Sequence, residues 1–213
     1  MASSFASVHF LNTDKINEDF VNLLKPHIQP QIVLKFLNLP DPEILGVVSN
    51  NVFSLFSEEF SIESVNEIVC KCYKDIEMPL IVTGGVFDGD VISLSIIKNG
   101  SVVSNITIKT KSDYGDVYAE FPTKYENVEL FEELFGVSSQ SLKESVVDDM
   151  VDTLDNWAEL INVPFNHSYY SAKVECENKN FKDFKNFVVN SQTDSAKIIK
   201  LEEITKLFLD NFQ

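Results

Sequence analysis

The chain has 213 residues, of which 44% are hydrophobic, and it carries a formal net charge of −16. This length is enough to bury a core, and the composition is that of an ordinary globular protein. All 17 basic residues are lysine, so the chain lacks arginine, which usually makes the bidentate contacts to phosphate and guanine. These features argue against binding to nucleic acid or to anionic membranes. An acidic surface of this kind can bind a basic protein partner or mimic DNA. A surface that is only solvated by water explains the same charge more simply.

Cysteine usage and hydropathy predict a reducing, cytoplasmic setting. No stretch approaches the roughly 18 consecutive apolar residues of a membrane span, and residues 1–7 lack the pattern of a signal peptide. Cys70, Cys72 and Cys176 are odd in number and do not resemble a disulfide framework. We interpret Cys72 as a small core residue and Cys70 as partly exposed. The three histidines are scattered, so the sequence predicts neither a zinc site nor a cofactor.

The first predicted elements are a strand and an amphipathic helix. Residues 5–11 alternate in part, as strands do, and residues 14–25 place their apolar side chains on one helical face. We expect Pro26 to end this helix. His9 lies on the predicted strand, where a half-buried structural histidine is commoner than a catalytic one.

Residues 26–51 hold four of the seven prolines, which argues against a long helix. We predict a connector that crosses the surface or lies at the edge of the sheet, with short strands over 31–37 and 44–48. A further strand is predicted over 52–57. The best amphipathic helix of the chain then runs from Ser61 to about residue 76, with apolar side chains at offsets of three and four.

A three-stranded antiparallel meander is predicted over residues 80–108. Asp88-Gly89-Asp90 and Asn99-Gly100 provide its two tight turns, because Asn, Asp and Gly tolerate the positive φ that such turns require. Gly84 and Gly85 lack the following helix of a phosphate-binding loop. They indicate instead a bulge or a close approach of backbones.

The sequence predicts an α+β fold, in which an antiparallel sheet built around this meander has helices on at least one face. We expect a single domain over 1–213, with a sheet-rich lobe over 1–125 and a mainly helical lobe over 126–213. The strand and helix pairs at 5–25 and 52–74 also suggest a weak internal repeat, whose units would pack side by side on one sheet.

Helices dominate the prediction after residue 125. Asn127 is the expected cap of a helix over 128–135, which Gly136 ends. Ser138 or Ser139 caps the next helix, which continues to about residue 161 with a break near Asp148.

The last fifty residues are predicted from weaker patterns. Residues 166–177 contain Tyr169, Tyr170 and Val174 and indicate one or two strands. The run over 181–188 has helical spacing, although its end is equally compatible with a strand. A terminal packing helix begins at Asp194 or Ser195.

Two segments are candidates for a functional site. The loop over 109–125 is long and aromatic enough to carry a binding surface, although a simple crossover explains it more economically. Asp148, Asp149, Asp152 and Asp155 line one side of a predicted helix. Of these, Asp148, Asp152 and Asp155 are spaced by four and three and can share one helical face. Carboxylates at this spacing can bind a metal, but no histidine accompanies them, and a solvated acidic face is the commoner arrangement.

Residues 51 to about 163 resemble a loose group of uncharacterised bacterial proteins. The resemblance rests on four stretches: Asn51–Ser57, Val86–Val91, Lys98–Gly100 and Leu134–Val137. The opening strand departs from the group, because Val52 stands where tryptophan is frequent. The resemblance implies the α+β fold and a bacterial, cytoplasmic setting, and it brings no catalytic residue.

Three functions follow as hypotheses. The first is a non-enzymatic interaction protein that binds another protein, for which a basic one is the expected kind, through an acidic surface. The alternative is a metal-dependent hydrolase that uses Asp88 and Asp90, although Asp-Gly-Asp between two strands is foremost a turn. The third is a small-ligand carrier lined by some of the 17 phenylalanines, although such cores are usually filled. Because no nucleophile motif is present, we assign no catalytic, cofactor-binding or metal-binding residue.

Overall fold

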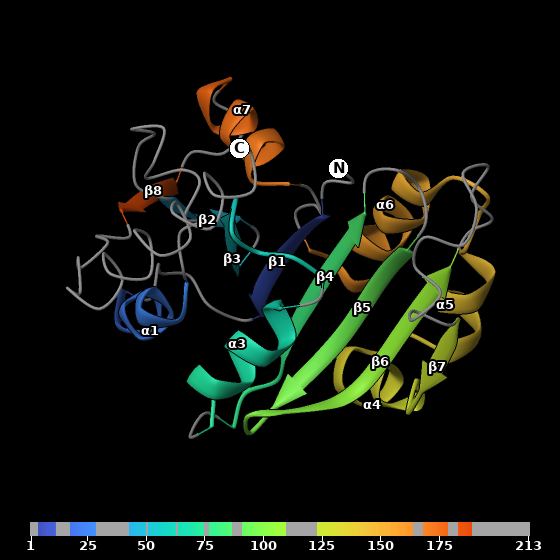
Figure 1. Ribbon diagram of the computed structural model, residues 1–213. Coiled ribbons are helices and arrows are strands. Elements are labelled where there is room, and N and C mark those ends of the chain that lie inside the picture. Colours follow the sequence, from blue (N-terminus) through green and yellow to red (C-terminus); the bar gives the residue numbers. More distant parts are fainter. Residues whose placement is uncertain are drawn as a thin grey trace, which may run out of the picture.

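The fold is α+β, with one eight-stranded antiparallel sheet and helices on both faces (Figure 1). The computed structural model describes residues 4–11, 18–28, 43–49, 51–62, 64–74, 77–86, 91–109, 123–163, 168–178 and 183–188. The strands lie in the order β7-β6-β5-β4-β1-β3-β2-β8, and every neighbouring pair is antiparallel. Within the described residues, no helix is long and apolar enough to cross a membrane.

Half of the sheet is the predicted meander together with a short edge strand. Its strands are β4 (Leu80–Val86), β5 (Val91–Lys98), β6 (Ser101–Lys109) and β7 (Lys124–Glu126). The tight turn between β5 and β6 has Asn99 at φ 50° and Gly100 at φ 70°, which confirms the turn predicted from Asn-Gly. Gly84 lies where β4 approaches β1 closely, because a Cβ there would be 2.8 Å from the carbonyl oxygen of Phe5.

The other half is built from strands that are distant in the sequence. These are β1 (Ser4–Leu11), β2 (Glu43–Ser49), β3 (Val52–Ser57) and β8 (Asp183–Val188). The strand predicted over 44–48 is confirmed, and it lies between β3 and β8 rather than at the edge. β1 and β3 are neighbours, so the two halves of the suggested repeat do lie side by side, while the duplication itself stays a prediction.

One face of the sheet is covered by α1 (Glu18–Leu24) and α3 (Val65–Cys72), with a short 3₁₀ helix, η1 (Lys25–His27), after α1. The α-helix ends at Leu24, just before Pro26 as predicted, and Pro26 lies inside the short η1 that follows. The core beneath these helices is aromatic. The Phe10 ring stacks on Phe53 with centroids 5.5 Å apart and meets Tyr73 edge-on at 5.8 Å.

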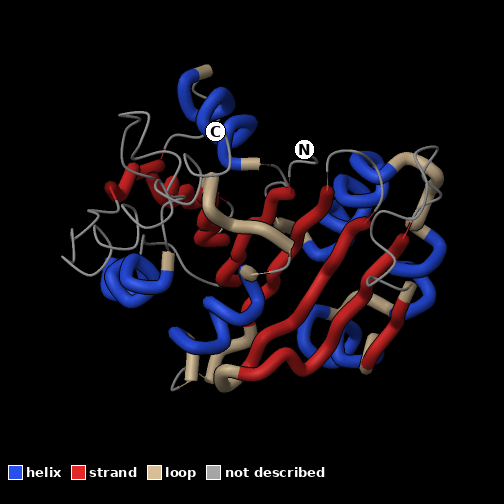
Figure 2. The backbone as a smooth tube through the Cα atoms, in the orientation of Figure 1, coloured by secondary structure: helices blue, strands red, loops and turns tan. Residues whose placement is uncertain are grey.

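The opposite face is covered by α4 (Glu129–Phe135), α5 (Ser139–Glu144) and α6 (Met150–Ile161), which Figure 2 shows behind the strands. Trp157 and Phe131 are fully buried in this core. Gly136 ends α4 at φ 71°, and Ser138 caps α5, as the sequence predicts. Asn127 does not cap α4; its side chain donates instead to the carbonyl oxygen of Val103, at 2.9 Å.

The strands predicted over 166–177 are wrong, because this stretch contains the helix α7 (Tyr169–Glu177). Ser168 caps α7 by accepting a hydrogen bond from the backbone of Ser171. Tyr169, Ala172 and Cys176 share one helical face and pack on β2 and β3. This tertiary contact outweighs the strand propensity of the two tyrosines and the valine.

Several predicted features lie outside the described residues. They are the strand over 31–37, the Asp88–Asp90 turn, most of the loop over 109–125, and the terminal helix from Asp194. Of that loop, the structure places β7 against β6. In the run over 181–188, the strand interpretation holds, since β8 pairs with β2.

Candidate functional site

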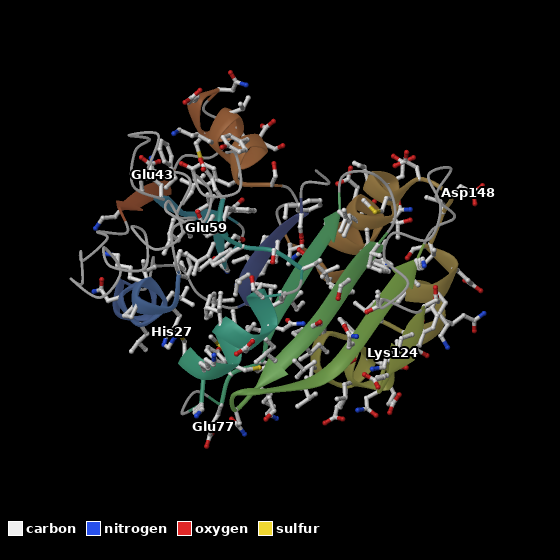
Figure 3. All side chains as sticks on the ribbon, viewed as in Figure 1. His27, Glu43, Glu59, Glu77, Lys124 and Asp148 are labelled. Atoms are coloured by element: carbon white, nitrogen blue, oxygen red, sulfur yellow. The ribbon has the colours of Figure 1, made fainter. Side chains whose placement is uncertain are left out.

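The helical layer formed by α4, α5 and α6 is strongly acidic. We call the exposed carboxylates of this layer and of the preceding strand β7 the acidic surface: Glu126, Glu129, Glu132, Glu133, Glu144, Asp148, Asp149, Asp152, Asp155 and Glu159. Residues 124–163 contain only two lysines against these ten acids. Figure 3 shows Asp148 at the periphery of the molecule on this side. Residues 124–163 thus carry a formal net charge of −8, half of the −16 of the whole chain.

The two lysines of this layer are both engaged locally. Lys124 Nζ lies 2.8 Å from Glu126 Oε1, and Lys143 Nζ lies 5.2 Å from the centroid of the Tyr125 ring. An exposed ion pair of this kind contributes at most about 1 kcal/mol to stability, so neither lysine organises the layer. The surface keeps a large excess of carboxylates.

A hydrogen-bonded corner holds the connection between α5 and α6. Thr153 Oγ1 accepts from the Val147 amide at 3.0 Å, and it lies 2.9 Å from the carbonyl oxygen of Asp149. Asn156 Nδ2 donates to the carbonyl oxygen of Ser145 at 2.9 Å. The Trp157 indole donates to the Leu142 carbonyl at 3.1 Å. These hydrogen bonds fix residues 142–149 to α6. The exposed side chains of Val147 and Asp148 therefore project from a well-ordered backbone.

The four aspartates predicted to line one helix have different roles. Asp149 caps α6 by accepting from the amides of Val151 and Asp152, at 2.8 and 3.1 Å. Asp148 precedes this cap, so only Asp152 and Asp155 of the predicted set lie within α6. The break predicted near Asp148 is confirmed. Among the residues that the structure describes, no group of His, Cys, Asp or Glu could hold a metal ion.

The exposed face of α6 combines acids with apolar side chains. Its exposed residues are Val151, Asp152, Asp155, Glu159 and Leu160. At about 100° per residue, Asp155, Glu159 and Asp152 lie about 40°, 80° and 100° around the axis from Val151, and Leu160 lies about 180° from it. The acids therefore form a central row, with Val151 and Leu160 on its two borders.

A second polar cluster, which the sequence analysis did not predict, lies inside the sheet. His9 Nδ1 is 2.8 Å from Ser54 Oγ, and His9 Nε2 is 2.9 Å from Ser7 Oγ. Ser7 Oγ is in turn 2.8 Å from Thr83 Oγ1. The Phe56 ring meets the imidazole edge-on, with centroids 6.1 Å apart.

This cluster has the contacts of an activated serine but lacks access for a substrate. A hydroxyl beside an imidazole is the arrangement in which a base activates a nucleophile. However, Ser7, His9 and Ser54 are all completely buried. His9 is thus more deeply buried than the half-buried histidine that we expected. A neutral imidazole has one donor and one acceptor nitrogen, so two hydroxyl partners fit it as a structural element.

A third polar row fastens α3 to the sheet. Asn66 Nδ2 on α3 lies 3.2 Å from Ser95 Oγ, and Asn105 Oδ1 accepts from Ser93 and Ser95 at 3.2 and 2.9 Å. Asn105 Nδ2 donates to Thr107 Oγ1 at 3.0 Å. The bonds of Asn105 are typical of a structural row, whereas the buried Asn66 Oδ1 makes no hydrogen bond within the described residues.

Tyr169, at the start of α7, and Lys173 form a polar contact with Glu43 on β2, which we call the latch. The Tyr169 hydroxyl donates to Glu43 Oε2, and Lys173 Nζ lies 3.4 Å from the same oxygen. Burial, together with the Glu43 carboxylate, raises the pKa of Tyr169 well above its ordinary range. The latch holds α7 on the sheet and leaves Tyr170 exposed.

The three cysteines are free. Cys70 and Cys72 are both half-buried against the core beneath α1 and α3, so Cys72 is less enclosed than the sequence suggested. Burial raises the pKa of both thiols, which disfavours the reactive thiolate. These cysteines therefore resemble packing residues.

The two aspartates of the hydrolase hypothesis, Asp88 and Asp90, lie outside the described residues, between the end of β4 and the start of β5. That hypothesis stays a prediction, and a calorimetric titration with Mg²⁺, Mn²⁺ or Ca²⁺ decides it.

No family model, no curated protein sequence and no solved structure matches this chain. The resemblance to the bacterial group also stays a prediction. Function must therefore be argued from the surface and the interior of this molecule.

Proposed function

We propose that this protein is a non-enzymatic interaction protein that binds a basic protein partner through the acidic surface, in a bacterial cytoplasm. One observation carries the proposal. Residues 124–163 carry ten exposed carboxylates but only two lysines, and both lysines contact neighbouring side chains of the same segment. Such a charge distribution steers a basic partner toward the surface and repels nucleic acid and other acidic proteins.

The buried polar cluster around His9 favours this proposal over an enzymatic role. It is the described arrangement closest to a nucleophile with its base, and it is closed to substrate. The acidic surface, in contrast, is exposed and rests on the hydrogen-bonded corner between α5 and α6. A rigid surface loses little conformational entropy on binding, which helps affinity.

The test is native mass spectrometry of the protein purified gently from its own host, in three forms. The first form is the wild type, for which we expect a co-purifying basic polypeptide. The second carries Asp148→Asn, Asp152→Asn and Asp155→Asn, and we expect the polypeptide to be lost. Asp149 stays unchanged because it caps α6.

The third form is a control with the same change in charge. It carries Glu67→Gln, Glu77→Gln and Glu177→Gln, which are exposed acids outside the acidic surface. The polypeptide should stay bound to this form. If both variants keep the polypeptide, or both lose it, the acidic surface is not the binding site. A small bound metabolite or metal in place of a polypeptide would favour the enzymatic alternative.

A further inference from the structure

We infer that two copies of this chain associate edge to edge through β7, in an antiparallel two-fold pairing centred on Tyr125. The pairing joins two eight-stranded sheets into one, and it places Lys124 of each copy opposite Glu126 of the other. The inference goes beyond the proposed function and does not depend on it, because the contact is made by the edge of the sheet.

β7 is an edge strand whose central residue directs its backbone outward. It lies at one end of the sheet, and the described residues contain no strand beyond it (Figure 1). Ser104 Oγ donates to the Glu126 carbonyl oxygen at 3.0 Å, so this carbonyl points toward β6. Backbone groups alternate in direction along an antiparallel strand, so the N–H and C=O of Tyr125 point away from β6. Such outward groups can pair with another strand.

A two-fold axis beside Tyr125 makes two such edges complementary. The Tyr125 N–H of each copy then donates to the Tyr125 carbonyl oxygen of the other, which gives two hydrogen bonds. The residues on either side, Lys124 and Glu126, become directly opposed across the junction. A two-fold contact requires a patch that complements itself, and Lys-Tyr-Glu opposed to its own reverse meets this requirement.

Charge selects both the occupant and the register. The Lys124 and Glu126 side chains are 47% and 48% exposed and pair with each other within one copy. In the two-fold pairing, each also meets the opposite charge on the second copy. An axis centred on either residue would oppose lysine to lysine or glutamate to glutamate, which is destabilising. Asn127, at φ 48°, follows the strand and limits further registers.

Tyr125 adds an aromatic contact on the other face of the strand. Its register partner on β6 is Ile106, which is buried in the core under α4 to α6, so the ring lies on that face. Tyr125 is 39% exposed. Directly opposed side chains of an antiparallel pair have Cβ atoms about 5 Å apart, so the two Tyr125 rings would meet across the axis.

The shortness of β7 makes this association weak. Three residues bury less area than a stable dimer needs. The net charge of −16 on each copy opposes association at low salt. At about 0.15 M salt the Debye length is about 8 Å, which screens this long-range repulsion more than the direct contacts of the strand. We therefore expect a dimer in rapid exchange, with a Kd of about 0.1–1 mM.

The experiment is a charge swap, measured by sedimentation equilibrium at about 0.15 M salt and up to about 1 mM protein. We expect the wild type to dimerise. Lys124→Glu and Glu126→Lys should each raise the Kd about tenfold, because both cross-strand pairs become like-charged. A 1:1 mixture of these variants should restore association as a heterodimer, since every opposed pair again has opposite charges. Lys124→Glu/Glu126→Lys should dimerise like the wild type.

Matched controls separate the edge strand from net charge. Lys71→Glu and Glu67→Lys make the same charge changes at the exposed ion pair of α3, and both should dimerise within about twofold of the wild type. Tyr125→Pro removes the outward N–H and spares the hydrogen bonds between β7 and β6, a position in which edge strands tolerate proline. This variant should be monomeric, with the circular dichroism spectrum of the folded wild type.

The outcomes separate this inference from the proposed function. A wild type that stays monomeric at every concentration overturns the inference, and so does a Lys124→Glu or Glu126→Lys variant that dimerises as strongly as the wild type. A mixture of those two variants that stays monomeric overturns it as well, because charge pairing across β7 would then not hold the copies together. None of these results affects the retention of a basic polypeptide, which tests the proposed function.

Discussion

At the scale of single residues, the buried polar side chains matter more for the stability of the sheet than the exposed ones do. His9 and Ser54 face each other on neighbouring strands, as do Ser7 and Thr83. Their hydrogen bonds join three strands at the centre of the sheet. Each buried hydroxyl or ring nitrogen would cost free energy if its partner were removed.

We therefore expect His9→Ala to lower the free energy of unfolding by about 3 kcal/mol, through a cavity and the unpaired hydroxyls of Ser7 and Ser54. Urea denaturation followed by circular dichroism measures the change. His27→Ala is the matched control, because His27 is exposed and its loss should change stability by less than about 0.5 kcal/mol. Equal stability of the two variants would contradict a structural role for His9.

Tyr73 makes the stability depend on pH at the alkaline end. Burial raises its pKa to about 12, so the folded state holds this proton after the unfolded chain has lost it near pH 10. The stabilisation is complete below pH 10 and is lost progressively as the pH rises to 12. Urea titrations across this range should show a steeper loss of stability for the wild type than for Tyr73→Phe, by about 2 kcal/mol in total. Identical slopes for the two proteins would show that Tyr73 ionises as in the unfolded chain.

At the scale of elements, most turns and helix ends were predictable because they depend on residues that are close in the sequence. The cap predicted at Asn127 was wrong because its side chain donates to the Val103 carbonyl oxygen on β6. Asn99-Gly100 places the turn between β5 and β6, and Gly136 ends α4. The break near Asp148 follows from the cap that Asp149 provides for α6. A short-range signal of this kind needs no knowledge of the partner strands.

Elements that depend on distant contacts were harder to predict. α7 is a helix because its buried face packs on β2 and β3, which precede it by more than a hundred residues. The polar cluster around His9 needs the register of three strands, which alternation along one strand cannot supply. Of the site, the sequence showed the acids of α6, but not their apolar borders, which depend on which face of the helix is buried.

The cap of α6 also gives a prediction at this scale. Asp149→Ala should lower the free energy of unfolding by about 1 kcal/mol, because the amides of Val151 and Asp152 lose their acceptor. Asp149→Asn retains an acceptor oxygen and should stay within a few tenths of a kcal/mol of the wild type. Thermal denaturation of the three proteins distinguishes a capping role from a purely electrostatic one. If Asn and Ala at this position were equally destabilising, charge and not capping would be the cause.

At the scale of the molecule, the charge is unevenly distributed between the two faces of the sheet. α1 and α3 cover one face over an aromatic core, and α3 carries an ion pair between Glu67 and Lys71. The helices α4 to α6 cover the other face and carry the acidic surface. Like charges gathered on one layer repel one another and destabilise the free protein. Such a cost is typical of surfaces that are kept for binding.

This repulsion leads to the prediction that loss of binding and gain of stability go together. Asp148→Asn/Asp152→Asn/Asp155→Asn should raise the free energy of unfolding at low salt by roughly 0.3 kcal/mol, because the relief of repulsion among three like charges is partly offset by the loss of the attraction between Asp152 and the N-terminus of α6. The gain should shrink as salt is added, since salt screens the repulsion in the wild type. The control variant Glu67→Gln/Glu77→Gln/Glu177→Gln should show no such gain, because its acids are dispersed and Glu67 pairs with Lys71. Urea denaturation of the three proteins at low and high salt measures both effects. Equal responses would mean that the acids of α6 do not repel one another more than acids elsewhere, and the argument that this layer is kept for a partner would fail.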